Sequence, residues 1–322
     1  MAGQGKQDQT AGRLDDAARA GWLYYVAGNT QDEIARALGV SRQSAQRLVS
    51  LALSEGLIKV QVDHPIAHCM ELGQSLAERF GLHFCDVVPS DPERPELLTG
   101  IAIAGAAQMT RYLKSKEPKI IALGTGRALR ACIEQMPSMS CPQHKIVSRL
   151  GNINADGSAT PYNAVIRMAD KTGAAHYPMP LPVQANSLEE LKALHSNRPV
   201  RKTLDLCRAA DVTFVGIGQI SITGPIVVDG FMPASEVAEL VAAGYVGEIT
   251  SYIYNVDGRL LEGSFNALVA SAPLEIIDDR PMIGIGLGTA KVGATIGALK
   301  GRLINALITD EATAAQILSE TA

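Results

Sequence analysis

Two glycine-rich loops carry the groups best suited to hold a small polar molecule. Gly124-Thr125-Gly126-Arg127 follows the apolar run 119–123 and opens a helical stretch, and the run from Gly284 to Lys291 repeats that design. Free backbone N–H groups at the positive end of a helix favour an anion or a polyhydroxyl ligand. Lys291 adds an ammonium group on the first turn. Each loop taken alone could equally be a tight turn that needs glycine only for its backbone.

Two further loops follow strand-like runs in the same way. Gly216 to Gln219 ends one run, and Asn255 to Gly258 ends another, although an Asp-Gly pair is more often a hairpin turn. Ligands of open α/β sheets bind at the carboxyl ends of strands, so four such loops favour a shared pocket. The predicted ligand-binding residues are Gly124, Thr125, Gly126, Arg127, Asn163, Gln219, Asp257 and Lys291.

No cofactor and no metal site is predicted. The third glycine of a dinucleotide-binding loop is replaced by Leu129, which argues against a nicotinamide cofactor. His64 and His68 are spaced to hold a metal ion together with Cys69 if they share one helix. Pro65 stands between the two histidines and fits better as the start of a helix.

Catalytic residues are not predicted either. The sequence shows no readable Ser, His and Asp set and no pair of carboxylates at a recognisable spacing. An enzyme remains the alternative interpretation, namely a sugar-phosphate isomerase or deaminase with an accessory helical head. Its acid and base groups would be Asp229, Asp257 or Glu262 converging on Lys291.

A second group of side chains is suited to nucleic acid. Within the helical stretch 42–53, two arginines and two glutamines face away from the apolar stripe. Arginine and glutamine hydrogen-bond to base edges and to phosphates. With two positions at helix starts added, the predicted DNA-binding residues are Gln31, Ser41, Arg42, Gln43, Gln46 and Arg47.

Two short helices that meet at a glycine turn position these side chains. Thr30 and Glu33 have the spacing of a capping box for the first helix. Gly39 ends that helix and Ser41 caps the next one. The pattern predicts a helix-turn-helix that binds double-stranded operator DNA.

The flanks of this motif favour DNA binding over two helices that merely pack together. A helix is predicted over 14–26, and residues 56–62 alternate apolar and polar side chains as a β-wing would. A helical scaffold that binds protein is the remaining alternative. Residues 1–62 hold seven Lys and Arg against six Asp and Glu, a net charge of +1. Because affinity for DNA grows with the phosphates neutralised, we expect several copies to act together as a homo-oligomer.

The body of the chain is predicted to be α/β with a Rossmann-like parallel sheet. From Phe84 onward, apolar β-branched runs alternate with glycines and helical stretches. The predicted strands are 85–89, 119–123, 145–150, 211–216, 248–255, 282–286 and one near Leu307, and the predicted helices include 97–114, 127–136, 188–194, 199–209 and 290–297. We predict two domains, a DNA-binding domain over 1–62 and an effector-binding and oligomerisation domain over 63–322.

Composition restricts the class of protein further. The chain has 322 residues, 47% of them hydrophobic, and a net charge of −4. Five scattered cysteines without a Cys-x-x-Cys pair support neither a disulfide framework nor a zinc ribbon. The polar first ten residues and the lack of a run of about 18 apolar residues predict a cytoplasmic protein without a membrane partner.

Taken together, these residues resemble the SorC family of bacterial sugar-binding transcriptional regulators over nearly the whole chain. The resemblance in the head rests on Tyr24-Tyr25, Gly28, Thr30-Gln31, Glu33-Ile34-Ala35, Gly39, Ser41-Arg42, Arg47-Leu48, Ala52 and Glu55-Gly56-Leu57. In the body it rests on Gly124-Thr125-Gly126-Arg127-Ala128-Leu129, Gly216-Ile217-Gly218, Gly244-Tyr245-Val246-Gly247, Asp257-Gly258 and Leu307-Ile308-Thr309-Asp310-Glu311.

The resemblance implies an effector domain with the fold of ribose-phosphate isomerase and glucosamine-phosphate deaminase but without their activity. The old substrate pocket would hold a sugar, sugar phosphate or polyol that modulates DNA affinity, with the Gly124 loop as its cradle and Lys291 as the pocket lysine. The resemblance also implies a tetramer, or dimers that pair on DNA. Thr125 and Ala128 replace the Trp and Thr usual in the family, so a non-phosphorylated sugar alcohol is an alternative to a phosphorylated effector.

Overall fold

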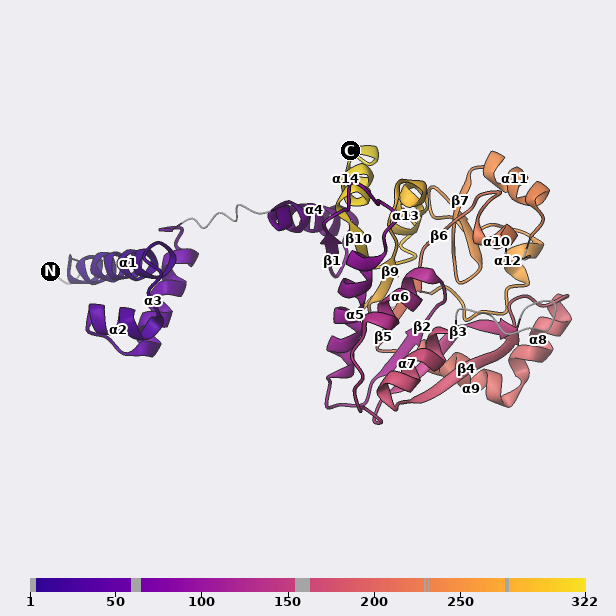
Figure 1. Ribbon diagram of the computed structural model, residues 1–322, viewed down its shortest axis with the longest axis horizontal. Helices are drawn as coiled ribbons and strands as arrows, with labels where there is room; N and C mark the ends of the chain where they lie inside the picture. The colour runs from indigo at the N-terminus through magenta and orange to yellow at the C-terminus, as the bar shows by residue number, and fades with distance from the viewer. Residues whose placement is uncertain (1–3, 59–64, 154–162, 229, 231, 276–277) are drawn as a thin grey trace. The chain divides into compact units, whose positions relative to one another are not determined.

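The chain forms two compact units. The computed structural model in Figure 1 describes residues 4–58, 65–153, 163–228, 230, 232–275 and 278–322. Contacts between residues divide the chain into unit 1, Met1–His64, and unit 2, Pro65–Ala322. The domain boundary predicted after residue 62 lies outside the described residues.

Unit 1 is helical over its described residues. It contains α1 (Gln4–Tyr25), α2 (Gln31–Leu38) and α3 (Arg42–Ser54), which bury a small core of Ala20, Ile34, Ala35, Ala45 and Val49. Gly21 lets α1 approach the segment after α3, because a Cβ at this position would lie 2.7 Å from Cδ1 of Ile58. The predicted wing is described only as far as Ile58, where the chain turns and bends, and the rest of it lies outside the described residues.

Unit 2 is built on a seven-stranded parallel sheet. The strands lie in the order β1-β10-β9-β5-β2-β3-β4, and each neighbouring pair is parallel. Their bounds are β1 Cys85–Val88, β2 Ile120–Leu123, β3 Lys145–Ile153, β4 Ala175–Pro182, β5 Val212–Gly216, β9 Met282–Ile285 and β10 Ala306–Asp310. Most of these strands are short and apolar, as expected for strands covered on both faces.

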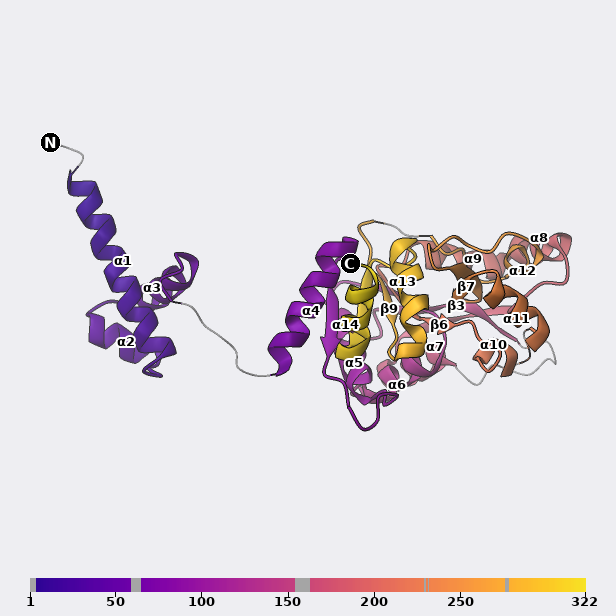
Figure 2. The ribbon, with the colours of Figure 1, turned by 90° about the horizontal axis from the view of Figure 1, so that it is seen from above.

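Helices cover both faces of this sheet. One face packs against α5 (Thr99–Leu113), α6 (Arg127–Gln135) and α7 (Ala164–Thr172). The other face packs against α4 (Pro65–Phe80), α9 (Arg198–Arg208), α13 (Val292–Lys300) and α14 (Glu311–Glu320), while α8 (Leu188–Ser196) precedes α9. In Figure 2 the helices α5, α6 and α7 lie on the opposite side of the strands from α9.

A smaller lobe completes unit 2. Its antiparallel sheet has the order β6-β7-β8, with bounds β6 Gly218–Gln219, β7 Tyr245–Ile249 and β8 Tyr252–Asn255. Short helices α10 (Pro225–Val228), α11 (Ala234–Ala242) and α12 (Ser264–Ala267) surround it, drawn in orange in Figure 1. The lobe has its own core, which includes Ile220, Val237 and Ile253.

Most predicted elements are confirmed to within a few residues, one predicted strand was wrong, and one strand of the large sheet was missed. The strand predicted over 248–255 is two strands, β7 and β8, joined by a tight turn at Thr250 and Ser251. The strand β4 was not predicted, because Pro178, Pro180 and Pro182 interrupt its sequence. β4 is the edge strand of its sheet, and the edge is where a strand tolerates proline.

Candidate functional site

The order of the strands places the first candidate site. The chain runs outward from β2 through β3 to β4 and then returns, so that β5 pairs with the other side of β2. Loops that leave two such neighbouring strands in opposite directions open a crevice, and ligands of open α/β sheets bind there. The loops after β2 and β5 are the predicted glycine runs 124–127 and 216–219.

The two loops touch each other. A Cβ at Gly216 would lie 3.0 Å from the backbone oxygen of Thr125, and Gly124 N donates to Phe214 O at 2.8 Å. Gly126 has a φ of 120° and a ψ of 168°, a backbone that glycine alone adopts readily, and it directly precedes α6. The loop therefore presents the first N–H groups of α6 at the crevice, as an anion or polyhydroxyl ligand would require.

Lys291 lies at the same edge of the sheet, in the segment that follows β9. Gly286 follows β9, and a Cβ there would lie 3.8 Å from Cδ of Lys291 and 3.4 Å from Cβ of Ile217. Lys291 is half-buried at the end of the single turn η1 (Thr289–Lys291), just before α13. Burial lowers the pKa of Lys291, the positive charge of Arg127 lowers it further, and the carboxylate of Glu248 opposes both.

The turn between β7 and β8 adds two residues that sequence reasoning missed. Thr250 and Ser251 both have left-handed backbones, with φ of 49° and 71°. A two-residue hairpin of this type normally takes Asn-Gly, and a β-branched residue with positive φ costs about 1–3 kcal/mol. Cγ2 of Thr250 lies 3.2 Å from where a Cβ at Gly124 would stand, so the strained turn packs on the glycine loop. The buried Thr250 Oγ1 has no hydrogen-bond partner in the described part of the chain.

Glu248 is a third residue that sequence reasoning missed. Its carboxylate accepts a hydrogen bond from Ser251 N at 3.0 Å and packs so closely on Gly218 that a Cβ there would clash with it. Burial raises the pKa of Glu248, while the hydrogen bond from Ser251 and the charge of Lys291 oppose that rise. A half-buried carboxylate, an ammonium and a buried hydroxyl without a hydrogen-bond partner in the described residues thus lie near the carboxyl ends of β2, β5 and β9. The only sequence signal for Glu248 was its position in a predicted strand.

The structure does not bring Asp257 to this crevice. Asn255 Oδ1 accepts hydrogen bonds from the backbone of Asp257 and Arg259, so Asp257 belongs to a tight turn after β8. The adjacent Gly258 packs against Gly301, at the end of α13 opposite to Lys291. The prediction of Asp257 as a ligand-binding residue therefore fails on geometry, and the hairpin-turn interpretation fits.

The structure does not connect the two remaining predicted residues, Gln219 and Asn163, to Lys291 or to the glycine loop 124–127 by a side-chain hydrogen bond within the described residues. Gln219 is half-buried on β6 and pairs with Gly247 of β7. Asn163 is half-buried directly before α7, after a segment outside the described residues. Of the residues of the enzyme alternative, Glu262 is exposed, and Asp229 lies outside the described residues.

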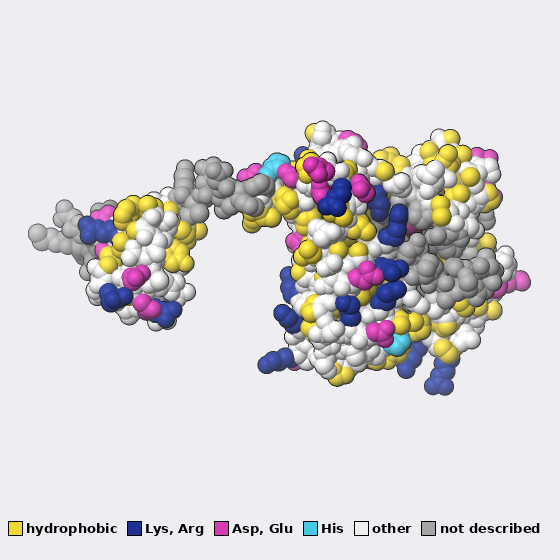
Figure 3. Space-filling view, in the orientation of Figure 1, with side chains coloured by type: hydrophobic (Ala, Val, Ile, Leu, Met, Phe, Trp, Pro, Cys, Tyr) yellow, Lys and Arg dark blue, Asp and Glu magenta, His cyan; other side chains and the backbone are white. Residues whose placement is uncertain are grey.

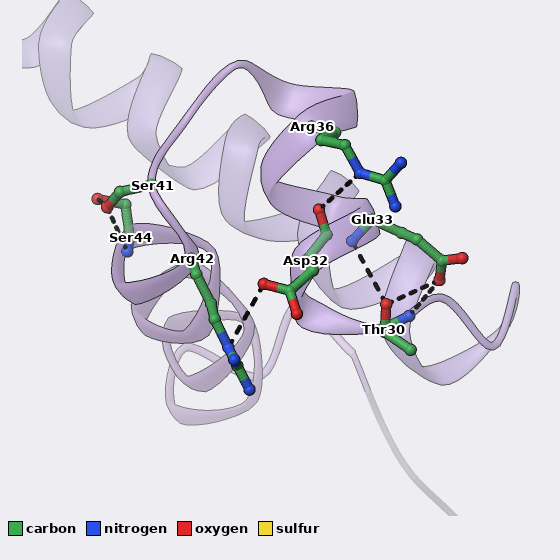
Figure 4. Close-up of polar contacts among 7 residues, drawn as sticks. All are labelled: Thr30, Asp32, Glu33, Arg36, Ser41, Arg42 and Ser44. Atoms are coloured by element: carbon green, nitrogen blue, oxygen red, sulfur yellow. Dashed lines mark hydrogen bonds and ion pairs between the residues drawn. The ribbon is translucent and has the colours of Figure 1, made fainter.

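The second candidate site is the pair α2 and α3 of unit 1, shown in Figure 4. Thr30 N donates to Glu33 Oε2 at 2.7 Å and Glu33 N donates to Thr30 Oγ1 at 3.4 Å, which is the predicted capping box. Gly39 ends α2 with a φ of 65°. Ser44 N donates to Ser41 Oγ at 3.1 Å at the start of α3.

The outer face of α3 carries the predicted polar residues. Arg42, Gln43, Gln46 and Arg47 are exposed, while Ala45, Val49 and Ala52 on the opposite face are buried. The ion pair between Arg42 Nε and Asp32 Oδ1 at 3.6 Å links the two helices (Figure 4). On the face seen in Figure 3, acidic and basic side chains lie side by side over α2. Arg47 makes no such ion pair with a carboxylate in the described residues, which leaves its charge available.

Other kinds of site find no support in the described residues. No group of three or more His, Cys, Asp and Glu side chains could hold a metal ion there. No described helix has the length and apolar character to span a membrane. Burial raises the pKa of the Cys85 and Cys132 thiols to about 12, so neither is a reactive nucleophile at neutral pH.

Known proteins resemble this chain in sequence and in fold. The family described as "Putative sugar-binding domain" matches residues 64–319. The erythritol catabolism regulatory protein EryD of Brucella abortus is 34% identical over 304 residues, which cover 94% of this chain and 96% of EryD. The transcriptional regulator LsrR of Escherichia coli K12 is 29% identical and covers 94% of each chain. The full-length sorbitol operon regulator SorC of Klebsiella pneumoniae has a TM-score of 0.69 at 26% identity, covering 95% of this chain and 99% of SorC.

The matched family model and the relatives define a class of transcriptional regulators that respond to a sugar. With its sugar-binding domain and its relatives, the chain belongs to the SorC family of sugar-binding transcriptional regulators. It is therefore a DNA-binding regulator whose activity a small carbohydrate effector modulates.

The raised pKa of Glu248 gives the first prediction. In the unfolded chain this carboxyl ionises near its ordinary pKa, whereas the fold must ionise it in a buried place, so its contribution to stability falls as pH rises through the raised value. We expect Glu248→Gln to be more stable relative to wild type at pH 7.5 than at pH 4.5, measured as the difference in Tm by circular dichroism. Glu239→Gln, which alters an exposed carboxyl on α11, is the control. An equal difference at both pH values would show that Glu248 is not ionised against a burial penalty.

Proposed function

We propose that unit 1 is a helix-turn-helix domain that binds double-stranded operator DNA through α3. The observation that supports this most directly is the exposed row Arg42, Gln43, Gln46 and Arg47 on a helix whose other face is buried. In a helix-turn-helix, the second helix enters the major groove and its early residues contact base edges. Gln31 and Ser41, at the starts of α2 and α3, are then placed for phosphates. We propose residues 1–62 as the DNA-binding domain and 63–322 as the effector-binding and oligomerisation domain.

We propose that the crevice of unit 2 binds a small, uncharged polyhydroxyl effector. The glycine loop 124–127, Glu248, Thr250 and Lys291 offer donors and acceptors together, which suits hydroxyl groups that both donate and accept. Glu248 supports an uncharged ligand, because a phosphate dianion beside an ionised carboxylate is repelled. A sugar phosphate is the alternative effector. It would bind to the N–H groups of the loop at Gly126 and to the ammonium group of Lys291. The relative EryD is named for erythritol, a sugar alcohol.

We propose further that the fold is that of ribose-phosphate isomerase and glucosamine-phosphate deaminase, with the pocket used for sensing rather than catalysis. Two described residues of the enzyme alternative support this, because Asp257 belongs to the turn that packs at the far end of α13, and Glu262 is exposed. The family's regulators also support a cytoplasmic place of action. Turnover of a sugar phosphate by the purified protein would contradict this part of the proposal.

An oligomer is the second prediction. A helix-turn-helix with a net charge of +1 over residues 1–62 neutralises few phosphates, so we expect dimers or a tetramer to present several α3 helices to DNA. A symmetric dimer places two such helices about one DNA turn apart, and the operator should then be an inverted repeat. Analytical ultracentrifugation of the full chain measures the state directly. A strict monomer at micromolar concentration, with or without operator, would contradict it.

The third prediction concerns Arg47. Arg47→Ala should weaken operator binding by roughly 1–3 kcal/mol, and only for the cognate sequence, if Arg47 contacts a base through both guanidinium nitrogens. A phosphate contact should instead weaken binding to all DNA alike. Titration of operator and scrambled DNA by fluorescence anisotropy separates these outcomes. Arg13→Ala, which removes the same charge from the exposed side of α1, is the matched control. Equal operator affinities for all three proteins would remove Arg47 from the interface.

The fourth prediction tests the crevice and its link to DNA. Lys291→Ala and Gly126→Val should abolish effector binding by calorimetry, with erythritol and other sugar alcohols as first ligands. Operator affinity without effector should stay close to wild type. Coupling between two sites is reciprocal and typically amounts to about 1–3 kcal/mol, so operator DNA should change effector affinity by roughly 5- to 150-fold.

Lys300→Ala serves as the control for this experiment, because Lys300 is exposed at the opposite end of α13. It should bind effector and operator as wild type does. Normal effector binding by Lys291→Ala would place the pocket elsewhere. Loss of operator binding by the same variant without effector would show that Lys291 supports folding rather than sensing.

A further inference from the structure

Arg149 is a buried arginine outside the effector crevice. It lies on β3 with 4% of its surface exposed. Its Nη2 donates to the backbone oxygens of Pro273 at 2.5 Å and Ala272 at 3.4 Å, and Ala272 N donates back to Arg149 O at 2.8 Å. Its Nε has no hydrogen-bond partner in the described part of the chain. These contacts hold the guanidinium in place but satisfy only part of it.

The charge of Arg149 also has no counter-charge in contact. In the described residues, no carboxylate lies within 4.0 Å of its guanidinium. Burial lowers the pKa of Arg149, and the nearby Cys207, Tyr252 and Glu275 oppose this. An arginine keeps its proton in proteins, so a buried guanidinium must be compensated by hydrogen bonds and by an anion. Carbonyl oxygens supply some hydrogen bonds but no net negative charge.

A cavity adjoins this guanidinium. It has a volume of about 40 Å³, and Arg149, Arg208, Arg280, Thr213 and Pro281 are among the residues that line it. A single water needs about 10–15 Å³, so the cavity has room for more than one water. Thr213 and Pro281 stand at the starts of β5 and β9, whereas the effector crevice lies at the ends of the same strands. The cavity is therefore separate from the effector crevice.

The lining of the cavity is positive. Three guanidinium groups and one carboxylate, that of the exposed Glu275, line it, while Asp279 pairs with Arg280 at 3.9 Å from outside the lining. Arg280 Nη1 donates to the backbone oxygen of Arg208 at 3.0 Å, and Arg208 pairs with Asp205 at 3.1 Å. Arg208 and Arg280 thus have partners of their own, and Arg149 is the charge left to compensate.

We propose that this cavity is a binding site for a small inorganic oxyanion of the phosphate or sulfate class, with Arg149 as its principal ligand. The oxyanion pairs with the guanidinium of Arg149 and supplies the missing negative charge, with Arg280 and Arg208 also lining the site. Guanidinium groups bind such anions through charge-assisted hydrogen bonds. The bound anion stabilises unit 2 by holding the starts of β5 and β9 against β3. This site is independent of the proposed effector.

Thermal unfolding of the full chain in increasing inorganic phosphate, at constant ionic strength set with sodium chloride, tests the proposal. Unfolding is followed by circular dichroism. We expect Tm to rise with saturation, by on the order of 5 °C at a hundred times the Kd. Arg149→Met should remove the saturable rise, while Lys291→Ala should retain it, because Lys291 belongs to the other site. Arg280→Met should weaken the apparent affinity several-fold.

Non-specific stabilisation by phosphate acts on every variant alike, so the difference between wild type and Arg149→Met isolates the site. If Arg149→Met does not fold, phosphate binding to Lys291→Ala by isothermal titration calorimetry decides the question. One saturable site per chain that sulfate displaces supports the proposal. A parallel, unsaturable rise in wild type and Arg149→Met, or no heat of binding in Lys291→Ala, would show that water alone occupies the cavity.

Discussion

The rest of unit 2 depends on one feature of the sheet: successive strands are added on one side of β2 up to β4, and from β5 onward on its other side. Because β2 continues to β3 on one side and β5 pairs on the other, two loops must leave neighbouring strands in opposite directions. The glycines at 124 and 216 let these loops approach within contact of each other and of Thr250. Ligands of open α/β sheets bind at such a point, where the strand order changes direction.

The small lobe borders this crevice with residues that do not stabilise the folded state. Thr250 and Ser251 take left-handed backbones, and Glu248 holds a carboxylate in a place where burial raises its pKa. A chain selected for stability alone would place Asn-Gly in the turn and a neutral residue at 248. The bond from Ser251 N to Glu248 compensates for part of both costs, because it fixes the turn and satisfies the carboxylate together. Local strain of this kind is typical of ligand sites.

The sequence predicted those parts of the fold and sites whose signals are local. The capping box at Thr30, the exposed row on α3 and the glycine loops all depend on residues a few positions apart, and each forms as predicted. Glu248 and Thr250 could not be found this way, because their role arises from packing against Gly218 and Gly124, far away in the chain. Asp257 shows the opposite error. Its Asp-Gly pair is a genuine local signal for a turn, and only the long-range contact of Gly258 with Gly301 shows that the turn faces away from the crevice.

Communication between the crevice and the DNA-binding unit needs an element that both can influence, and α4 meets the structural requirement. Gly288, in the loop that carries Lys291, donates its N–H to Thr313 Oγ1 on α14 at 2.8 Å. The helix α14 in turn packs on α4, where Arg79 donates to Leu318 O at 2.7 Å. α4 begins at Pro65, the first residue of unit 2 and the residue that follows unit 1 in the chain. A ligand that prefers one position of the Gly288 loop therefore biases α14 and α4 through direct contacts. It alters DNA binding only to the extent that its affinity differs between the states of the protein that bind DNA well and poorly.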